Sequence, residues 1–149
     1  MFDKKVRARR LADVAEFEVI KNMYNELKGQ AAIVTGDSSG IGRGIAERFA
    51  AEGVDVVITG RHEATLKEAA ASSDKIHYVV AGMTNTDDVA KTVTYAKDHF
   101  GRLDILVNCA GWCPVQNIKE MKLEDYNRAF DLDVKVVVDM TIQSLPLLL

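Results

Sequence analysis

Three glycines stand close together between an apolar run and a segment of helical spacing. The stretch TGDSSGIG, residues 35–42, carries them at Gly36, Gly40 and Gly42. Glycine is needed where a backbone takes a positive φ or approaches a bulky anion, because a Cβ would collide there. The free N–H groups and the positive dipole end of a helix beginning here would face that anion. The spacing therefore predicts a loop that binds the phosphates of a nucleotide.

The segments around this loop alternate between strand and helix patterns. Strands are expected at residues 31–35, 54–59, 76–80 and 103–108, and helices at 41–53, 63–71, 86–101 and most of 122–149. Thr86 is the expected N-cap of the helix that ends at Gly101. Strands alternating with helices, without hairpin signals, predict βαβ units and a parallel sheet that is buried on both faces. The fold class is therefore α/β.

The N-terminal segment has a pattern of its own. From Lys4 to Leu27 apolar residues recur three or four positions apart, which is typical of an amphipathic helix, and Gly29 supplies a stop. We favour a helix that packs on its own domain over one that binds a partner or a membrane surface.

Composition and charge exclude several classes of protein. The net charge of −3 implies no general affinity for nucleic acid. No apolar run reaches the roughly 18 residues of a membrane span, and acidic residues among the N-terminal basic ones argue against a mitochondrial presequence. Two cysteines, Cys109 and Cys113, are too few for a disulfide scaffold and lack further zinc ligands nearby. We expect reduced thiols, no metal site, no membrane association and a cytoplasmic location.

Two motifs resemble those of the short-chain dehydrogenase/reductase family. TGDSSGIG matches the T-G-x-x-x-G-x-G pattern, and GRLDILVNCAG, residues 101–111, is similar to the signature in which the fourth strand ends in N-N-A-G, with Cys109 replacing the second Asn. YNRAFDLDVKVVV is similar to the helix that follows, and the resemblance covers about residues 23–149. It implies a Rossmann-like parallel sheet with flanking helices, truncated after about four strands. We therefore divide the chain into an N-terminal helical extension, residues 1–28, and a partial dinucleotide-binding domain, residues 29–149.

Carried onto this chain, the resemblance implies a nucleotide site. The residues that would surround the pyrophosphate and the adenosine ribose are Gly36, Ser38, Ser39, Gly40, Ile41 and Gly42. Those that would lie by the adenosine and nicotinamide riboses are Asn108, Ala110 and Gly111. Asn108 also fits a simple strand-end cap, and Asp104 would brace the fourth strand. Gly82 replaces the aspartate that usually faces the adenine amino group, although Met83 beside it still offers a backbone N–H.

The choice of cofactor depends on the end of the second strand. NAD enzymes place a carboxylate there for the ribose 2′-hydroxyl, whereas NADP enzymes place an arginine near the 2′-phosphate. This chain has Gly60 at the acidic position and Arg61 next to it, and arginine binds phosphate bidentately. The resemblance therefore implies NADP rather than NAD. The alternative is that Arg61 only caps the strand in solvent.

The catalytic residues of the family have no counterpart in these 149 residues. The reaction of the family transfers a hydride between a nicotinamide and a carbonyl or alcohol carbon. It uses a Tyr as acid and base, a Lys four residues after that Tyr, and a Ser. In the family all three lie beyond the helix that here ends in LPLLL. Tyr24 and Lys28 have the Tyr–Lys spacing but precede the first strand. Asp133 holds the place of an asparagine that supports a proton relay, and Val136 replaces a frequent glycine. We therefore expect no catalytic residue in this chain.

Three functions are compatible with these observations. The first is the nucleotide-binding portion of a short-chain oxidoreductase, cut short and inactive; the apolar ending QSLPLLL favours it. The others are a non-catalytic nucleotide-binding or protein-interaction module and an enzyme completed by another chain. An open fourth strand and an uncovered last helix predict self-association or a completing chain. The helix residues expected to be uncovered are Val136, Val137, Val138, Leu145 and Leu147.

Overall fold

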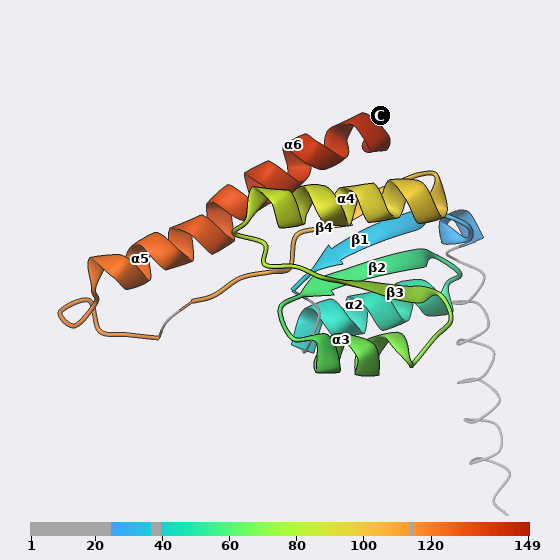
Figure 1. Cartoon of the computed structure of the whole chain (residues 1–149). Helices are drawn as coiled ribbons and strands as arrows, with labels where there is room; N and C mark the ends of the chain where they lie inside the picture. The colour runs from blue at the N-terminus through green and yellow to red at the C-terminus, as the bar shows by residue number, and fades with distance from the viewer. Residues whose placement is uncertain (1–24, 37–39, 114) are drawn as a thin grey trace, which may run out of the picture.

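The computed structural model describes residues 25–36, 40–113 and 115–149 (Figure 1). Its strands are β1 (Ala31–Thr35), β2 (Asp55–Gly60), β3 (Ile76–Val80) and β4 (Ile105–Val107). They form one parallel sheet in the order β3-β2-β1-β4. The predicted α/β class and Rossmann-like sheet are confirmed, with β4 shorter than expected.

Helices cover both faces of this sheet (Figure 1). The helical segments of the described residues are η1 (Asn25–Leu27), α2 (Gly40–Ala51), α3 (Glu63–Ala70), α4 (Thr86–Phe100), α5 (Leu123–Phe130) and α6 (Val136–Leu148), with a π-helical segment, η2 (Asp131–Lys135), joining the last two. Successive strand side chains point to opposite faces. Ala32 and Val34 therefore pack on the side of α2 and α3, while Ile33 and Val57 pack on the side of α4 and α6. All of β1 is buried, as its apolar run predicts.

Local residue types explain where α4 begins and ends. Gly101 takes a left-handed conformation with φ of 70° and ends the helix where expected. The N-cap is Asn85 rather than the predicted Thr86, because the Asn85 side chain accepts the N–H of Asp87 at 2.9 Å. Both residue types cap helices well, so the sequence alone left this one-residue difference open.

The segments α5, η2 and α6 follow one another as a long helix whose N-terminal part extends beyond the sheet (Figure 1). Val136 is 3% exposed, so its predicted exposure is wrong. It lies on the buried face of α6 with Met140 and Ser144, four residues apart, and α4 covers that face. Val138 and Leu145 are exposed as expected, at 52% and 44%.

The predicted N-terminal helix lies mostly outside the described residues. Only its last part is described, and Asn25–Leu27 form a short 3-10 helix there. The proposed boundary between residues 28 and 29 stays a prediction. Within the described part of the chain, the helices are too short or too polar to cross a membrane.

Candidate functional site

A threonine at the end of β1 joins this strand to the loop after β4. The buried Thr35 Oγ1 accepts the N–H groups of Cys109 and Ala110 at 3.0 and 3.1 Å. The same hydroxyl donates to the carbonyl oxygen of Val107 at 3.4 Å. Thr35 is absent from the predicted site residues, although a threonine directly before a strand-end glycine is the visible signal. One side chain thus fixes the position of the chain that leaves β4.

Gly36 brings the end of β1 into backbone contact with β2 and with the loop after β4. Its φ is 71°, and its N–H donates to the carbonyl of Thr59 at 3.1 Å. A Cβ on Gly36 would lie 2.4 Å from the Cα and 2.6 Å from the N of Ala110. Glycine is therefore required here both by the left-handed conformation and by the close approach of the neighbouring loop.

A cavity of about 660 Å³ opens at the carboxyl ends of the strands. The predicted site residues that line it are Gly36, Arg61, Met83, Ala110 and Gly111. The helical wall is formed by Glu124, Asn127, Arg128, Asp131 and Leu132. In parallel α/β sheets, ligands bind outside the carboxyl ends of the strands where the strand order reverses, which here is between β1 and β4. The cavity has the size of a small-molecule or cofactor site.

The other predicted residues are placed differently. Gly40 begins α2, where Ile41 is 77% exposed and Gly42 is buried within the helix, and none of the three lines the cavity. Ser38 and Ser39 lie outside the described residues. The Oδ1 atom of Asn108 is buried and has no partner among the described residues. Because buried polar atoms are nearly always hydrogen-bonded, this oxygen marks a place where a further donor is expected.

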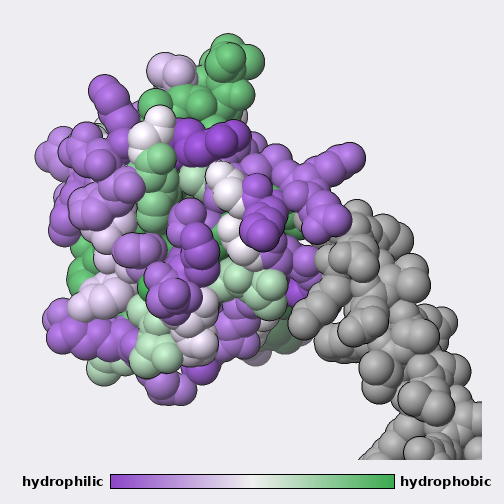
Figure 2. Space-filling view, turned by 90° about the vertical axis from the view of Figure 1, so that its right-hand side faces the viewer, coloured by the Kyte–Doolittle hydropathy of each residue, from purple (hydrophilic) through white to green (hydrophobic). Residues whose placement is uncertain are grey.

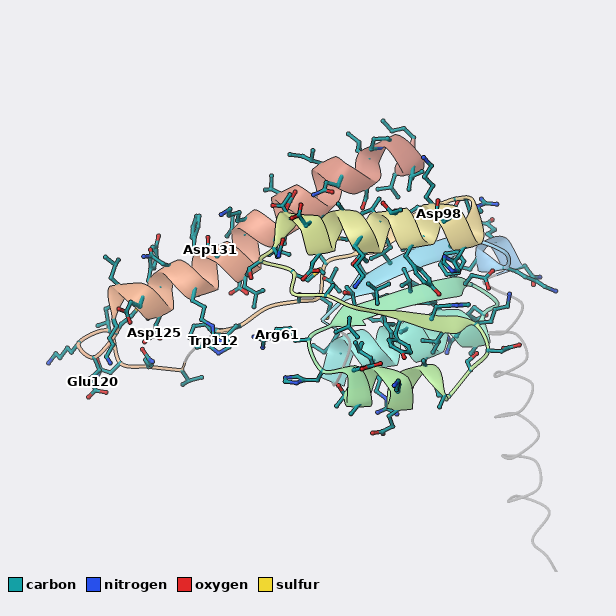
Figure 3. The ribbon with its side chains drawn as sticks, viewed as in Figure 1. Arg61, Asp98, Trp112, Glu120, Asp125 and Asp131 are labelled. Carbon is teal, nitrogen blue, oxygen red and sulfur yellow. The ribbon has the colours of Figure 1, made fainter. Side chains whose placement is uncertain are left out.

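Arg61 is an exposed member of the cavity lining. It is exposed and extends from the end of β2, in the view of Figure 3, on the side of the sheet from which the Trp112 loop also extends. Gly60 supplies no side chain at the position that carries an acid in NAD-binding folds. The carboxylates that line the cavity, Glu124 and Asp131, come instead from α5 and η2.

The long helix holds the same loop from the opposite side. Asp133 Oδ1 accepts the N–H of Trp112 at 2.7 Å, and a Cβ on Gly111 would lie 3.1 Å from this oxygen. The guanidinium of Arg128 lies 4.3 Å from the centre of the Trp112 ring, within the range of a cation–π contact. Neither Trp112 nor Arg128 is among the predicted site residues. The loop is therefore fixed by β1 on one side and by the helix on the other.

Asp104 has the bracing role predicted for it. Its Oδ2 accepts the N–H of Ala31 at 2.8 Å, which ties the start of β4 to β1. Arg102 donates to both carboxylate oxygens, at 2.6 and 2.7 Å. These bonds from Arg102 hold the pKa of Asp104 below its ordinary value, partial burial opposes them, and the Ala31 N–H adds to the lowering.

Comparison with known proteins identifies the family. Residues 30–149 match the family model described as short chain dehydrogenase. The chain belongs to this family. Glucose 1-dehydrogenase 2 of Bacillus subtilis is 39% identical over 119 residues, which are 75% of this chain and 46% of that protein. The 3-hydroxyacyl-CoA dehydrogenase type-2 of Drosophila melanogaster is 35% identical over 115 residues, 72% and 45% of the two chains.

Solved structures agree with this assignment. A 3-ketoacyl-(acyl-carrier-protein) reductase from Brucella melitensis, complexed with NADH, has a TM-score of 0.77 and 35% identity, covering 81% of this chain and 50% of its own. A short-chain dehydrogenase/reductase described as glucose/ribitol dehydrogenase, from the same organism, has a TM-score of 0.78 and 32% identity. The chain spans about half the length of these relatives.

Proposed function

We propose that this chain binds NADP(H) in the cavity at the carboxyl ends of its strands, as the nucleotide-binding portion of a short-chain oxidoreductase. The observation that carries the proposal is the convergence of predicted cofactor residues from separate strand ends on one cavity. Gly36 follows β1, Arg61 follows β2, Met83 lies beyond β3, and Ala110 and Gly111 follow β4. Residues so distant in sequence line one cavity of cofactor size only because the sheet brings the strand ends together.

Each part of the nucleotide has candidate partners on this chain. The N-terminus of α2, which begins at Gly40, presents free N–H groups and a positive dipole end to the pyrophosphate. Asn108, Ala110 and Gly111 would lie by the adenosine and nicotinamide riboses, and Met83 would offer its backbone N–H to the adenine. When bound, NADP(H) accepts or supplies a hydride in the reaction of this family with carbonyl or alcohol substrates.

The preference for NADP over NAD rests on charge at the end of β2. Gly60 has no carboxylate to bind the ribose 2′-hydroxyl or to repel a 2′-phosphate, and Arg61 beside it is exposed at the cavity. A guanidinium binds a phosphate through two charge-assisted hydrogen bonds, each stronger than a neutral one. A cytoplasmic location, where NADP(H) is available to such a domain, is part of the same proposal.

Calorimetric titration tests the site and its preference together. We expect NADP(H) to bind more tightly than NAD(H). Losing a charge-assisted contact of about 1.5–3 kcal/mol, Arg61→Ala should weaken NADP binding by roughly 10–150-fold and NAD binding hardly at all. Lys97→Ala is the matched control, because it removes one exposed positive charge from the far end of α4. Equal affinities for the two cofactors, or equal effects of the two variants, would refute the role of Arg61.

The phosphate loop has a separate test. Gly42→Val places a branched side chain inside the buried start of α2, where the helix must approach the pyrophosphate. We expect the variant to lose nucleotide binding. Normal binding by a folded Gly42→Val chain would show that the nucleotide lies elsewhere.

A further inference from the structure

An open apolar groove of about 430 Å³ lies between α2 and β4, on the opposite face of the sheet from α4 and α6. The described residues that line it are Ile41, Gly44, Ile45, Arg48, Phe49 and Val107. Ile41 is 77% exposed, and a Cβ on Gly44 would meet nothing within 4 Å. No described residue lines both this groove and the cavity at the carboxyl ends of the strands, so the two surfaces are separate.

Among the described residues, the layer of helices on this face stops short of β4. There α3 lies over β2 and β3, and α2 lies over β1 and β2, whereas β4 contacts α6 on the other face (Figure 1). Ile105 and Val107 of β4 pack on the α2 side and are only partly buried. Parallel sheets have both faces covered. One further helix beside α2 would complete this layer and bury the groove.

The N-terminal segment joins the described structure beside the groove. The N–H of Gly29 donates to the carbonyl of Gly53 at 3.0 Å, which fixes the chain next to the end of α2. Leu27 packs against the same buried cluster as Ile45 and Phe49. The apolar residues that lead to Leu27 at steps of three or four are Phe17, Ile20 and Tyr24. This spacing places them on one side of a helix, with Leu27 as its last member.

The end of the domain where the strands begin offers little apolar surface to these side chains. Figure 2 views this end, and its described residues are mostly hydrophilic apart from the end of α6. The chain reaches the domain here, because η1 directly precedes β1 (Figure 1). The groove, which extends from Phe49 to Ile41 along α2, supplies the apolar surface that this end lacks.

The apolar series and the groove match in spacing. A helix that leads to Leu27 runs toward the end of α2 and is therefore parallel to it. Because both helices rise by about 1.5 Å per residue, side chains with one constant offset stay at one level. An offset of 24 residues pairs Phe17 with Ile41, Ile20 with Gly44, and Tyr24 with Arg48. Gly44 lets the larger Ile20 approach closely, and the Tyr24 ring meets the aliphatic stem of Arg48.

We propose that residues 14–24 form a helix that lies in the groove, parallel to α2 and over the uncovered face of β4. The segment belongs to the same chain and is joined to the domain at Gly29, so its effective concentration at the groove exceeds that of any separate molecule. The inference does not depend on nucleotide binding, since the groove and the cavity are separate.

Cysteine pairs test the position and register of the segment. In a background with Cys109→Ser and Cys113→Ser, Ile20→Cys with Gly44→Cys should form a disulfide within one chain on mild oxidation. Ile20→Cys with Lys67→Cys is the control, because Lys67 is exposed on α3. Non-reducing electrophoresis and peptide mass analysis identify the bonds. Equal yields from the two pairs, or a disulfide formed only between chains, would overturn the proposal.

Hydrogen exchange followed by mass spectrometry tests the burial of the segment. The amides of residues 14–24 should exchange slowly in the unmodified chain, and Ile41→Asp should accelerate them by roughly tenfold or more. Ile118→Asp is the matched control, because Ile118 is 78% exposed and lies away from the groove. On the segment itself, Ile20→Asp should have the effect of Ile41→Asp, whereas Val19→Asp on its opposite side should not.

Circular dichroism checks that each variant keeps the folded domain. Fast exchange of residues 14–24 in the unmodified chain would overturn the proposal, as would equal effects of Ile41→Asp and Ile118→Asp. Protection that rises with protein concentration would assign the groove to a second copy of the chain instead.

Discussion

Replacing Gly36 with alanine measures how strongly the end of β1 is joined to the loop after β4. The added methyl group would lie 2.4 Å from the Cα of Ala110, inside any van der Waals contact. To reach a separation of about 3.5 Å, the loop must move away by about 1 Å. Such a movement lengthens both bonds that Thr35 Oγ1 accepts, now 3.0 and 3.1 Å, beyond hydrogen-bonding distance.

The expected loss of stability has two parts. An alanine held at positive φ costs about 1–2 kcal/mol. Two lost hydrogen bonds, each with a net value of about 0.5–1.5 kcal/mol, add about 1–3 kcal/mol. Gly101→Ala isolates the first part, because Gly101 has nearly the same φ, 70°, and its Cβ would meet nothing within 4 Å. Gly36→Ala should therefore lower the free energy of unfolding by about 1–3 kcal/mol more than Gly101→Ala.

Urea unfolding followed by far-UV circular dichroism, at one protein concentration, measures this difference. With a slope of about 1–3 kcal/mol per molar urea, the midpoint of Gly36→Ala should fall about 1 M below that of Gly101→Ala. Tryptophan fluorescence reports on the same loop, because Trp112 is the single tryptophan of the chain. Coincident midpoints of the two variants would refute the claim that contact with Ala110 requires glycine at position 36.

Three further predictions concern carboxylates and activity. The pKa of Asp104 is lowered in the folded state, chiefly by Arg102, so its stabilisation is complete above the ordinary carboxyl pKa and is lost as the pH falls through the lowered one. Asp104→Ala should therefore destabilise the chain by about 1.5–3 kcal/mol at pH 7, and the difference in urea midpoint should begin to narrow only below about pH 4 and close at still lower pH. Asp133→Ala should shift the Trp112 emission to the red, whereas Asp133→Asn, which keeps an acceptor oxygen, should shift it less. The 149 residues should oxidise NADPH at the background rate with a panel of carbonyl substrates; turnover lost on Asp133→Ala would show that its carboxylate takes part in catalysis.

Much of the fold was predictable because its signals are local. The β-branched run of β2 and the Gly101 stop of α4 each report on a few adjacent residues. The burial of Val136 was not predictable in this way, because it depends on α4 lying beside α6. The π-helical segment has only an indirect signal in the sequence, which is that apolar residues recur every four positions from Phe130 to Ile142.

The residues of the candidate site likewise differ in whether a local sequence signal points to them. The glycine motif and Arg61 could be proposed from sequence because their spacing from a strand end carries the information, and their roles in binding stay predictions. The contacts of Thr35 and of Asp133 with the loop after β4 could not be proposed in this way, since they join residues 74 and 21 positions apart. Such contacts depend on tertiary arrangement, and no periodicity of the sequence reports them.

The loop from Cys109 to Trp112 connects the stability of the domain to its proposed ligand. Thr35 holds one end of the loop and Asp133 the other, while Ala110 between them lines the cavity. A nucleotide that binds only the folded chain raises its stability by about 2.7 kcal/mol at a hundredfold excess over the dissociation constant. Gly36→Ala, which displaces this loop, should lower both the stability of the free chain and the further stabilisation by NADP.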